Sequence, residues 1–386
     1  MVSGDKHRAK RLAGEFYATN PFSYAEYATS AYDRVSEEIV TKLGIGVVGV
    51  GTMGKRHAEN IRRLIPEAQL IALADTDLAR AKQVATELEI EHAYNSVEAL
   101  VERKDIQAVA VVTPAKFHGA AIKVCARAGK DIFCEKPLTL TVHEADEVLA
   151  VTAKARVRLQ PGHVRRYDPA HVRARKRIEA GEIGDPVIFK SLARDPAPPP
   201  LSYMQSGVNG MFFQDSTVHE FDLGRWMMND EIAELHAYGA VLVCPELAQF
   251  NDIDTALVNM KFSRGALGAV ENYMQACYGY DIRTEIVGSK GTIMLGYLRQ
   301  TPELVLTASG TRTDVVDHFL VRFADAYLDE MRDFVRTMLT DRDPQVDGFD
   351  GRQAVAAAAA AERSYREGRP VTLQNPTRPA GVVHLK

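Results

Sequence analysis

The 386-residue sequence lacks several features that define large classes of proteins. No stretch approaches the roughly 18 consecutive apolar residues that a membrane-spanning helix needs, and residues 1–43 show no apolar run after a basic start. The four cysteines, Cys125, Cys134, Cys244 and Cys277, form no C-x-x-C pair, which argues against a disulfide framework and against a zinc site. We therefore expect a protein of the reducing cytoplasm that binds no metal and no membrane.

The sequence also lacks an excess of charge of one sign. Acidic and basic residues are interspersed and the formal net charge is -4, so no charged field points to a nucleic acid as the partner. A small molecule is the expected ligand. The length is sufficient for two domains, each of which can bury its own core.

Residues 44–165 alternate between short apolar runs and helical patterns. The runs predict strands at 45–50, 70–74, 108–112, 132–134 and 157–160, and the patterns between them predict helices at 52–64, 77–88, 117–128 and 142–153. This alternation is typical of repeated β-α units. It predicts an α/β fold that begins with a Rossmann domain, a doubly wound parallel sheet.

The character of the sequence changes after residue 165. Strand-like runs at 187–193, 233–243, 256–262, 266–274 and 284–287 occur without long helices between them, and helical patterns follow at 324–339 and 353–361. We therefore predict an open, mostly antiparallel sheet in a substrate and oligomerisation α/β domain over residues 166–350. Residues 351–386 are expected to pack back on the first domain. Residues 1–43 form an N-terminal extension, either a docked arm or a mobile tail.

A glycine-rich turn, Gly49-Val50-Gly51-Thr52-Met53-Gly54, lies between the first predicted strand and helix. Its glycines permit a tight turn and let main-chain N–H groups approach a pyrophosphate, although such a turn can also be merely structural. Asp75 ends the next predicted strand, 21 positions after Gly54, where its carboxylate can accept a hydrogen bond from a ribose 2'-hydroxyl. A 2'-phosphate would meet Asp75 as a like charge, so NAD is favoured over NADP, although Arg80 is a helical turn away.

Two further segments follow predicted strands of the first domain. Thr113-Pro114 and Glu135-Lys136-Pro137 both lie at the carboxyl ends of parallel strands, where open α/β sheets bind ligands. We predict that Thr113, Pro114 and Glu135 contact the cofactor; the alternative for Lys136 is a solvated lysine paired with Glu135. His118 opens a helix, where it can touch the cofactor or act as a cap or packing residue.

Asp215, His219 and Asp222 are spaced i, i+4 and i+7, so on a helix they share one face. An acid and an imidazole presented together suit proton transfer. The alternative is a capped helix with Asp215 as N-cap and His219 as a core histidine. The segment Arg165-Arg166-Tyr167 can bind an anion or form salt bridges at the domain junction.

At these residues the chain resembles the glucose-fructose oxidoreductase/inositol dehydrogenase family, often called Gfo/Idh/MocA, from residue 44 to the C-terminus. The signatures are the glycine-rich turn, the E-K-P tripeptide at 135–137 and the D-x-x-x-H pattern of Asp215 and His219. Segments 162–168, 219–222, 275–281 and 323–327 look like the inositol 2-dehydrogenase branch. The extension at 1–43 and the proline-rich loop at 196–200 depart from the family's pattern.

The resemblance implies an enzyme, often a homo-tetramer, that uses NAD to oxidise a secondary ring hydroxyl of a cyclitol or related sugar. His219 is then the general base, Lys136 orients the substrate oxygen, and Asp215 orients the pair. Arg166 and Tyr280 are the substrate contacts that the resemblance suggests. The alternatives are a sugar oxidoreductase with a tightly bound nucleotide, a glycosidase that cycles NAD, and a non-catalytic NAD-sensing protein.

Overall fold

The computed structural model describes residues 42–296, 304–376 and 378. The N-terminal extension predicted at 1–43 therefore lies outside the described residues, apart from its last two positions. The end of the predicted C-terminal segment, 379–386, also lies outside them.

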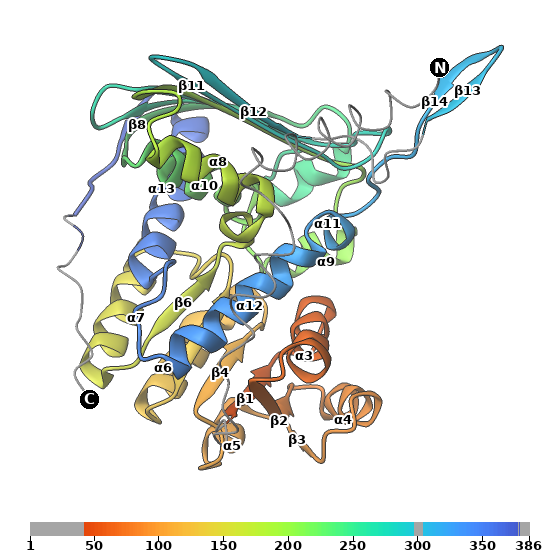
Figure 1. The fold of residues 1–386 in the computed structure, drawn as a ribbon, viewed down its shortest axis with the longest axis vertical. Coiled ribbons are helices and arrows are strands. Elements are labelled where there is room, and N and C mark those ends of the chain that lie inside the picture. Colours follow the sequence, from red (N-terminus) through yellow and green to blue (C-terminus); the bar gives the residue numbers. More distant parts are fainter. Residues whose placement is uncertain (1–41, 297–303, 377, 379–386) are drawn as a thin grey trace, which may run out of the picture. The chain divides into compact units, whose positions relative to one another are not determined.

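The first domain is built on a six-stranded sheet with the order β3-β2-β1-β4-β5-β6 (Figure 1). Its strands are β1 (Leu43–Val48), β2 (Ala68–Ala74), β3 (His92–Tyr94), β4 (Ala108–Val111), β5 (Asp131–Glu135) and β6 (Leu159–Gly162). All neighbouring pairs are parallel, which confirms the predicted Rossmann sheet. The strand order reverses between β1 and β4, and ligands of such sheets bind where it does.

Helices cover both faces of this sheet, so β1 is buried along its whole length. They are α3 (Thr52–Leu64), α4 (Leu78–Glu87), α5 (Val97–Val101), α6 (His118–Arg127) and α7 (Val142–Ala155). The side chains of Asp77, Ser96 and Thr141 accept hydrogen bonds from main-chain N–H groups at the starts of α4, α5 and α7. The chain does not run directly from α4 to β4, because the short elements β3 and α5 intervene.

The second domain contains a seven-stranded sheet with the order β12-β11-β7-β10-β9-β8-β15. Its strands are β7 (Pro186–Asp195), β8 (Ile232–Ala240), β9 (Thr255–Phe262), β10 (Leu267–Met274), β11 (Asp281–Gly288), β12 (Thr292–Gly296) and β15 (Val371–Thr372). Among its described strand pairs only β7 and β10 run parallel, so the predicted mostly antiparallel sheet is confirmed.

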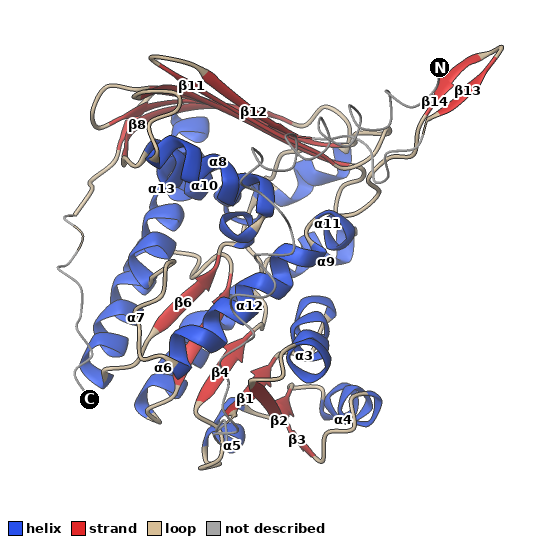
Figure 2. Cartoon of the chain, in the orientation of Figure 1, coloured by secondary structure: helices blue, strands red, loops and turns tan. Residues whose placement is uncertain are grey.

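One face of the second sheet packs on helices and the other does not (Figure 2). The covering helices are α8 (Pro169–Glu179), α10 (Val218–Met228) and α13 (Gly348–Glu367). Burial along β9 alternates residue by residue, with Ala256, Val258 and Met260 turned into the core. This alternation is expected for a sheet that buries a single face.

Two late helices connect the domains. α12 (Ala324–Leu339) returns to the first domain, where Met331, Phe334 and Val335 join the core that β1 and α3 form. α13 packs on β8 and α10 of the second domain and also on α7 of the first. The two domains are therefore held together by extensive packing.

The remaining elements are short. They are α9 (Leu201–Ser206), α11 (Phe319–Arg322), the hairpin β13 (Val305–Thr307) and β14 (Gly310–Arg312), a π-helical turn (Phe213–Thr217), and 3-10 turns at Ala115–Phe117, Val164–Tyr167 and Pro245–Phe250. None of the described helices combines the length and apolar character that crossing a bilayer requires.

Candidate active site

A cavity of about 730 Å³ opens at the carboxyl ends of β1, β2, β4 and β5. Its lining includes most of the residues predicted to bind the cofactor, namely Gly49, Gly51, Thr52, Met53, Asp75, Thr113, Pro114 and Glu135. The second domain contributes Tyr203, Asn209 and Asp215 to the lining, and Lys136 of the first domain also lines the cavity. The cavity therefore joins the predicted cofactor residues to part of the predicted catalytic set.

The glycine-rich turn has the local geometry that a dinucleotide requires. Gly49 has a φ of +84°, and a Cβ there would lie 2.6 Å from the carbonyl oxygen of Val112. A Cβ on Gly54 would lie 1.8 Å from the carbonyl oxygen of Gly49, so this glycine permits close packing of α3 on the strand rather than lining the cavity. A Cβ on Gly51 would meet no described atom within 4 Å, which leaves space for a pyrophosphate at the start of α3.

Asp75 follows β2 and presents its carboxylate to the same cavity. It accepts hydrogen bonds from the N–H groups of Val50 and Asp77, both at 2.9 Å, and from the guanidinium of Arg80. Burial opposes ionisation, but these donors outweigh it and hold the pKa of Asp75 below its usual value. The side chain is therefore an ionised acceptor at the position predicted for a ribose contact.

His118 is buried beneath this region instead of lining the cavity. Its Nδ1 lies 2.8 Å from the carbonyl oxygen of Pro137 and its Nε2 lies 2.7 Å from that of Thr113. The ring thus links the loops that follow β4 and β5. Burial lowers the pKa of His118, and a neutral ring can donate a hydrogen bond to only one of these two carbonyl oxygens. This position favours the packing interpretation, and direct contact with the cofactor stays a prediction.

Lys136 contacts Asp215 across the domain boundary. Its Nζ donates to the Oδ1 of Asp215 at 3.0 Å and to the main-chain oxygen of the same residue at 2.7 Å. The hydroxyl of Tyr203 in α9 donates to the other carboxylate oxygen, Oδ2, at 3.1 Å. The side chain of Lys136 is therefore paired with Asp215 and not with Glu135. The carboxylate of Glu135 accepts a hydrogen bond from the main-chain N–H of Lys136 instead.

His219 lies in the first turn of α10, one helical turn beyond Asp215. Its Nδ1 is buried and has no hydrogen-bond partner among the described residues. Burial holds the pKa of His219 well below its usual value, and the charges of Lys136 and Arg165 act in the same direction. The imidazole is therefore neutral at neutral pH, the form that can accept a proton.

The helix predicted to carry Asp215 and His219 is not α-helical along its whole length. Asp215 lies in the π-helical turn Phe213–Thr217, and α10 begins at Val218. Asp215 is not an N-cap in this arrangement, because Thr217 precedes α10 and makes no side-chain cap hydrogen bond. A π-turn shifts the register of a helix and is often found at functional sites.

The two predicted substrate contacts differ in their surroundings. The guanidinium of Arg166 is buried against Asp222, with Nε 2.8 Å from Oδ2, and against Asp350. Of the two roles considered for the segment 165–167, anion binding and salt bridges, Arg166 therefore has the second. Contact of Arg166 with the substrate stays a prediction. Tyr280 is buried, and its pKa is raised by burial and by the charge of Asp195.

Arg165 and Asp195, which the sequence interpretation did not single out individually, lie near the catalytic candidates, because the charge of Arg165 acts on His219 and the charges of Asp215 and Lys136 act on Asp195. Arg165 forms a buried ion pair with Glu220, and its charge acts on both His219 and Asp195. Asp195 ends β7, and burial together with the charge of Glu220 raises its pKa to about 6. The only sequence signal was the position of Asp195 at the end of a strand, immediately before the proline-rich loop.

A second cluster of buried polar residues adjoins the cavity, because one of its members, Glu135, also lines the cavity. Ligating atoms of His57, Glu135 and Glu330 all lie within 4.8 Å of one another, a spacing that could hold a metal ion. His57 Nε2 and Glu135 Oε1 are already hydrogen-bonded at 2.7 Å. Burial raises the pKa of Glu330 well above its usual value, and the charge of Glu135 adds to this. A protonated Glu330 makes a poor ligand, so the absence of a metal stays our prediction.

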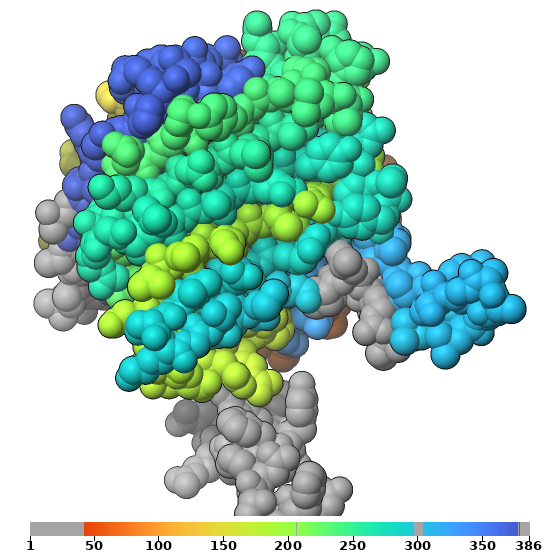
Figure 3. All heavy atoms as spheres, turned by 90° about the horizontal axis from the view of Figure 1, so that it is seen from above, coloured from red at the N-terminus to blue at the C-terminus, as the bar shows by residue number. Residues whose placement is uncertain are grey.

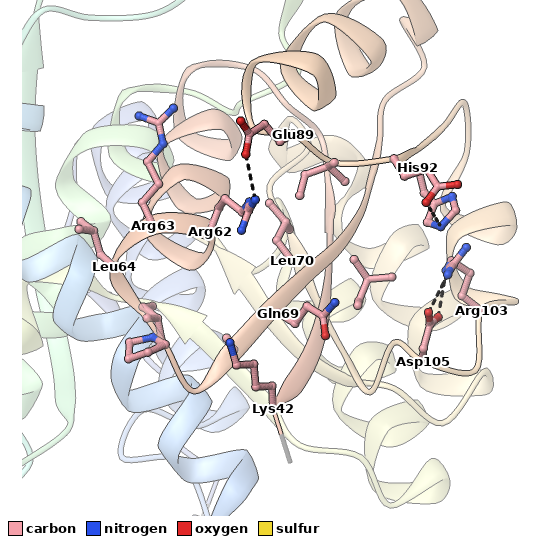
Figure 4. A pocket seen from close by; sticks show the side chains of 16 residues that line it. Lys42, Arg62, Arg63, Leu64, Gln69, Leu70, Glu89, His92, Arg103 and Asp105 are labelled. Atoms are coloured by element: carbon pink, nitrogen blue, oxygen red, sulfur yellow. Dashed lines mark hydrogen bonds and ion pairs between the residues drawn. The ribbon is translucent and has the colours of Figure 1, made fainter. Parts of the chain in front are cut away.

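Another depression, of about 1040 Å³, lies at the amino ends of the first sheet (Figure 4). Several of its charged side chains pair with one another: Arg62 contacts Glu89 at 3.2 Å and Arg103 contacts Asp105 at 2.6 Å. Because ligands of open α/β sheets bind at the carboxyl ends of the strands, this depression is not the candidate active site.

Two models of one protein family, Gfo/Idh/MocA, match the chain. Residues 43–163 match the model described as an oxidoreductase family, NAD-binding Rossmann fold. Residues 175–373 match the model described as an oxidoreductase family, C-terminal alpha/beta domain. The two matches correspond to the two sheets of the fold.

Individual proteins are similar over the same length. The chain is 38% identical over 331 residues to the myo-inositol 2-dehydrogenase of Thermotoga maritima, covering 86% of this chain and 98% of the relative. It is 37% identical over 327 residues to the scyllo-inositol 2-dehydrogenase (NAD(+)) of Bacillus subtilis, covering 85% and 95%. The solved structure of scyllo-inositol dehydrogenase from Lactobacillus casei with bound NAD(H) and scyllo-inositol matches with a TM-score of 0.80 at 29% identity, covering 86% of this chain and 99% of that chain.

Proposed function

The chain belongs to the Gfo/Idh/MocA oxidoreductase family, and we propose that it oxidises a secondary ring hydroxyl of an inositol to the ketone with NAD. The relatives named above, which act on myo-inositol and scyllo-inositol, support this substrate class. The observation that carries the proposal is the contact of Lys136 with Asp215 at the cofactor cavity, with a neutral His219 one helical turn further.

The first domain supplies the cofactor site. The N–H groups at the start of α3 face the space beside Gly51, where a pyrophosphate fits, and Asp75 accepts from the adenosine ribose. Thr113, Pro114 and Glu135 line the cavity further along, beside Lys136. Bound NAD would supply the hydride acceptor.

Three side chains have distinct roles in the removal of the hydroxyl proton. Lys136 donates a hydrogen bond to the reacting oxygen and stabilises the negative charge that develops on it. His219 accepts the hydroxyl proton, which a neutral imidazole can do. Asp215 orients Lys136 through one carboxylate oxygen, while Tyr203 occupies the other.

A polyol needs several polar partners in addition to the group that reacts. The charges of Arg165 and Asp195 act on the pKa of Tyr280, and those of Arg165 and Lys136 act on the pKa of Asp195. These side chains therefore lie near one another. We propose that Tyr280, Arg165 and Asp195 bind the hydroxyls that do not react. Arg165 is a better candidate for this role than Arg166, because Arg165 contacts one carboxylate, that of Glu220, and its Nε has no hydrogen-bond partner among the described residues. The guanidinium of Arg166 is held by both Asp222 and Asp350.

Assembly as a homo-tetramer is part of the same proposal. The outer face of the second sheet carries exposed apolar side chains, among them the cross-strand neighbours Tyr238 and Leu257. Figure 3 views this face, on which β7 crosses as a yellow-green band between blue-green neighbours. An apolar sheet face that no described helix covers is suited to packing against a second copy. The free thiols of all four cysteines agree with a cytoplasmic location.

The activity can be tested by following NADH absorbance with myo-inositol, scyllo-inositol, glucose and a panel of aldoses. We expect reduction of free NAD with an inositol and little with glucose. Failure of every substrate to reduce free NAD would contradict the proposal and favour a sugar oxidoreductase with bound nucleotide or a glycosidase that cycles NAD. Light scattering on the same preparation would test the tetramer.

A further inference from the structure

The carboxylate of Asp75 already uses its full capacity to accept hydrogen bonds. Oδ2 accepts from the main-chain N–H of Val50 at 2.9 Å and from Arg80 Nε at 3.1 Å. Oδ1 accepts from the main-chain N–H of Asp77 at 2.9 Å and from Arg80 Nη2 at 2.6 Å. A carboxylate offers about four acceptor positions. A ribose diol can therefore bind Asp75 only if one of these donors leaves.

Arg80 is the donor that can leave. Val50 belongs to the glycine-rich turn and Asp77 is the N-cap of α4, so the backbone fixes both of their N–H groups. Arg80 lies in the first turn of α4, lines the cofactor cavity, and has 48% of its side chain exposed, against 4% for Asp75. Its long side chain can rotate into solvent without disturbing the core.

We propose that Arg80 gives this site a second binding mode, for a dinucleotide that carries a 2'-phosphate, such as NADP. The proposal rests on the proposed dinucleotide site. With NAD, the ribose diol takes the place of Arg80 on Asp75. With a 2'-phosphate, Arg80 stays on Asp75 and directs its remaining N–H donors at the phosphate, because a guanidinium carries five donors in one plane and Asp75 uses two of them.

In the second mode the guanidinium lies between the two anions. The like-charge repulsion between Asp75 and a 2'-phosphate is then offset by an arginine that both can contact. The position of one side chain decides which nucleotide fits. Asp75 consequently lowers the affinity for NADP less than the carboxylate alone would.

The test measures binding by the full-length protein without any polyol. The dissociation constants of NAD and NADP are compared, together with those of AMP and adenosine 2',5'-bisphosphate, which carry only the adenosine half. Arg80→Ala is expected to lower the NADP-to-NAD affinity ratio by about tenfold or more, the size of one charge-assisted hydrogen bond. NAD loses a competitor for Asp75, and NADP loses its cation.

Two further variants sharpen the result. Arg80→Lys keeps the charge but not the planar fork, so its ratio should lie between those of Arg80→Ala and the wild type. Arg62→Ala is the matched control, because Arg62 has a similar exposure of 42% and also pairs with a carboxylate, at the opposite end of the first sheet. Its ratio should equal that of the wild type.

An unchanged ratio in Arg80→Ala would overturn the proposal, and so would a wild-type protein that binds NAD and AMP but neither of the 2'-phosphorylated compounds. A protein that binds both dinucleotides as expected but oxidises no polyol would leave this inference standing and contradict the proposed activity instead.

Discussion

The cofactor half and the substrate half of the site are assembled in different ways. On the cofactor side, the glycine-rich turn and Asp75 lie within a single β-α-β unit, and their spacing alone brings them together. On the substrate side, Lys136 meets Asp215 across 79 positions, and Arg165 meets Glu220 across 55. In the proposed mechanism, cofactor binding therefore depends on local turns, whereas proton transfer depends on how the two domains pack. Mutations should be able to damage one half and spare the other.

Replacing the proposed base, His219, should lower turnover more than the substitutions of Asp75, Asp195 and Glu330 described in the next paragraphs. His219→Asn keeps the approximate size of the ring but cannot accept the proton, so turnover should fall by about 10²-fold or more. Cofactor affinity should stay near that of the wild type. Initial rates and NADH fluorescence titrations on the same samples measure both. A variant that keeps most of its rate would make His219 a packing residue.

The wild-type pH profile bears on the same residue. Because burial depresses the pKa of His219, the neutral base is the main form well below pH 6.5. The acidic limb of polyol oxidation that belongs to His219 should therefore lie well below that pH, instead of near the value for a free histidine. A limb centred near pH 6.5 that disappears in His219→Asn would contradict this environment.

Replacing Asp75, the proposed acceptor for the ribose hydroxyl, should affect cofactor binding. Asp75→Ala should weaken NAD by about 1 to 3 kcal/mol, the range of hydrogen bonds to a charged group, while NADP improves relative to NAD. Turnover at saturating cofactor should change little. Calorimetric titration with both nucleotides measures the preference, and an unchanged preference would reject Asp75 as the ribose contact.

A smaller effect is expected at Asp195. Its pKa of about 6 means that the carboxylate ionises as the pH rises through that value, and an ionised carboxylate accepts stronger hydrogen bonds from hydroxyl groups. KM for the polyol should therefore fall severalfold between pH 5 and 7, while KM for NAD stays constant. Asp195→Asn should remove this dependence. If the variant retained it, the titrating group would have to be another residue.

The smallest effect concerns stability. The pKa of Glu330 in the folded protein lies above its value in the unfolded chain, so the folded state binds more protons between the two values and stability falls as the pH rises through that window. The loss should be about 1 kcal/mol or more, the order of the cost of an unpaired buried polar group. Glu330→Gln should flatten the dependence of the unfolding free energy on pH, and an equally steep dependence would contradict the assignment.

Sequence reasoning succeeded where the signal was local. The predicted helices at 52–64 and 324–339 have the bounds of α3 and α12, because each is long and periodic. β3 and α5 were missed because they span only three and five residues. The π-helical turn was missed because the i, i+4 spacing of Asp215 and His219 fits an ordinary helix equally well.

The substrate side could be predicted only in part. The motifs indicated Lys136, Asp215 and His219, but no spacing in the sequence indicates that Tyr203 donates to Asp215. Similarly, the composition of α12 shows an apolar face without showing that this face covers the first domain rather than the second. Contacts between distant segments depend on tertiary packing, which local patterns do not encode.

The central claim is that the pair Lys136 and Asp215 serves proton chemistry and not cofactor binding. Lys136→Ala tests it most directly when turnover and the dissociation constant of NAD are measured on one preparation. Lys123→Ala, a lysine of the same domain that pairs with Glu147 on the surface, is the control. The account predicts that Lys136→Ala loses turnover by about 10²-fold or more while NAD binds nearly as before. An equal loss of turnover and of NAD affinity would contradict it and make Lys136 a cofactor-binding or structural residue.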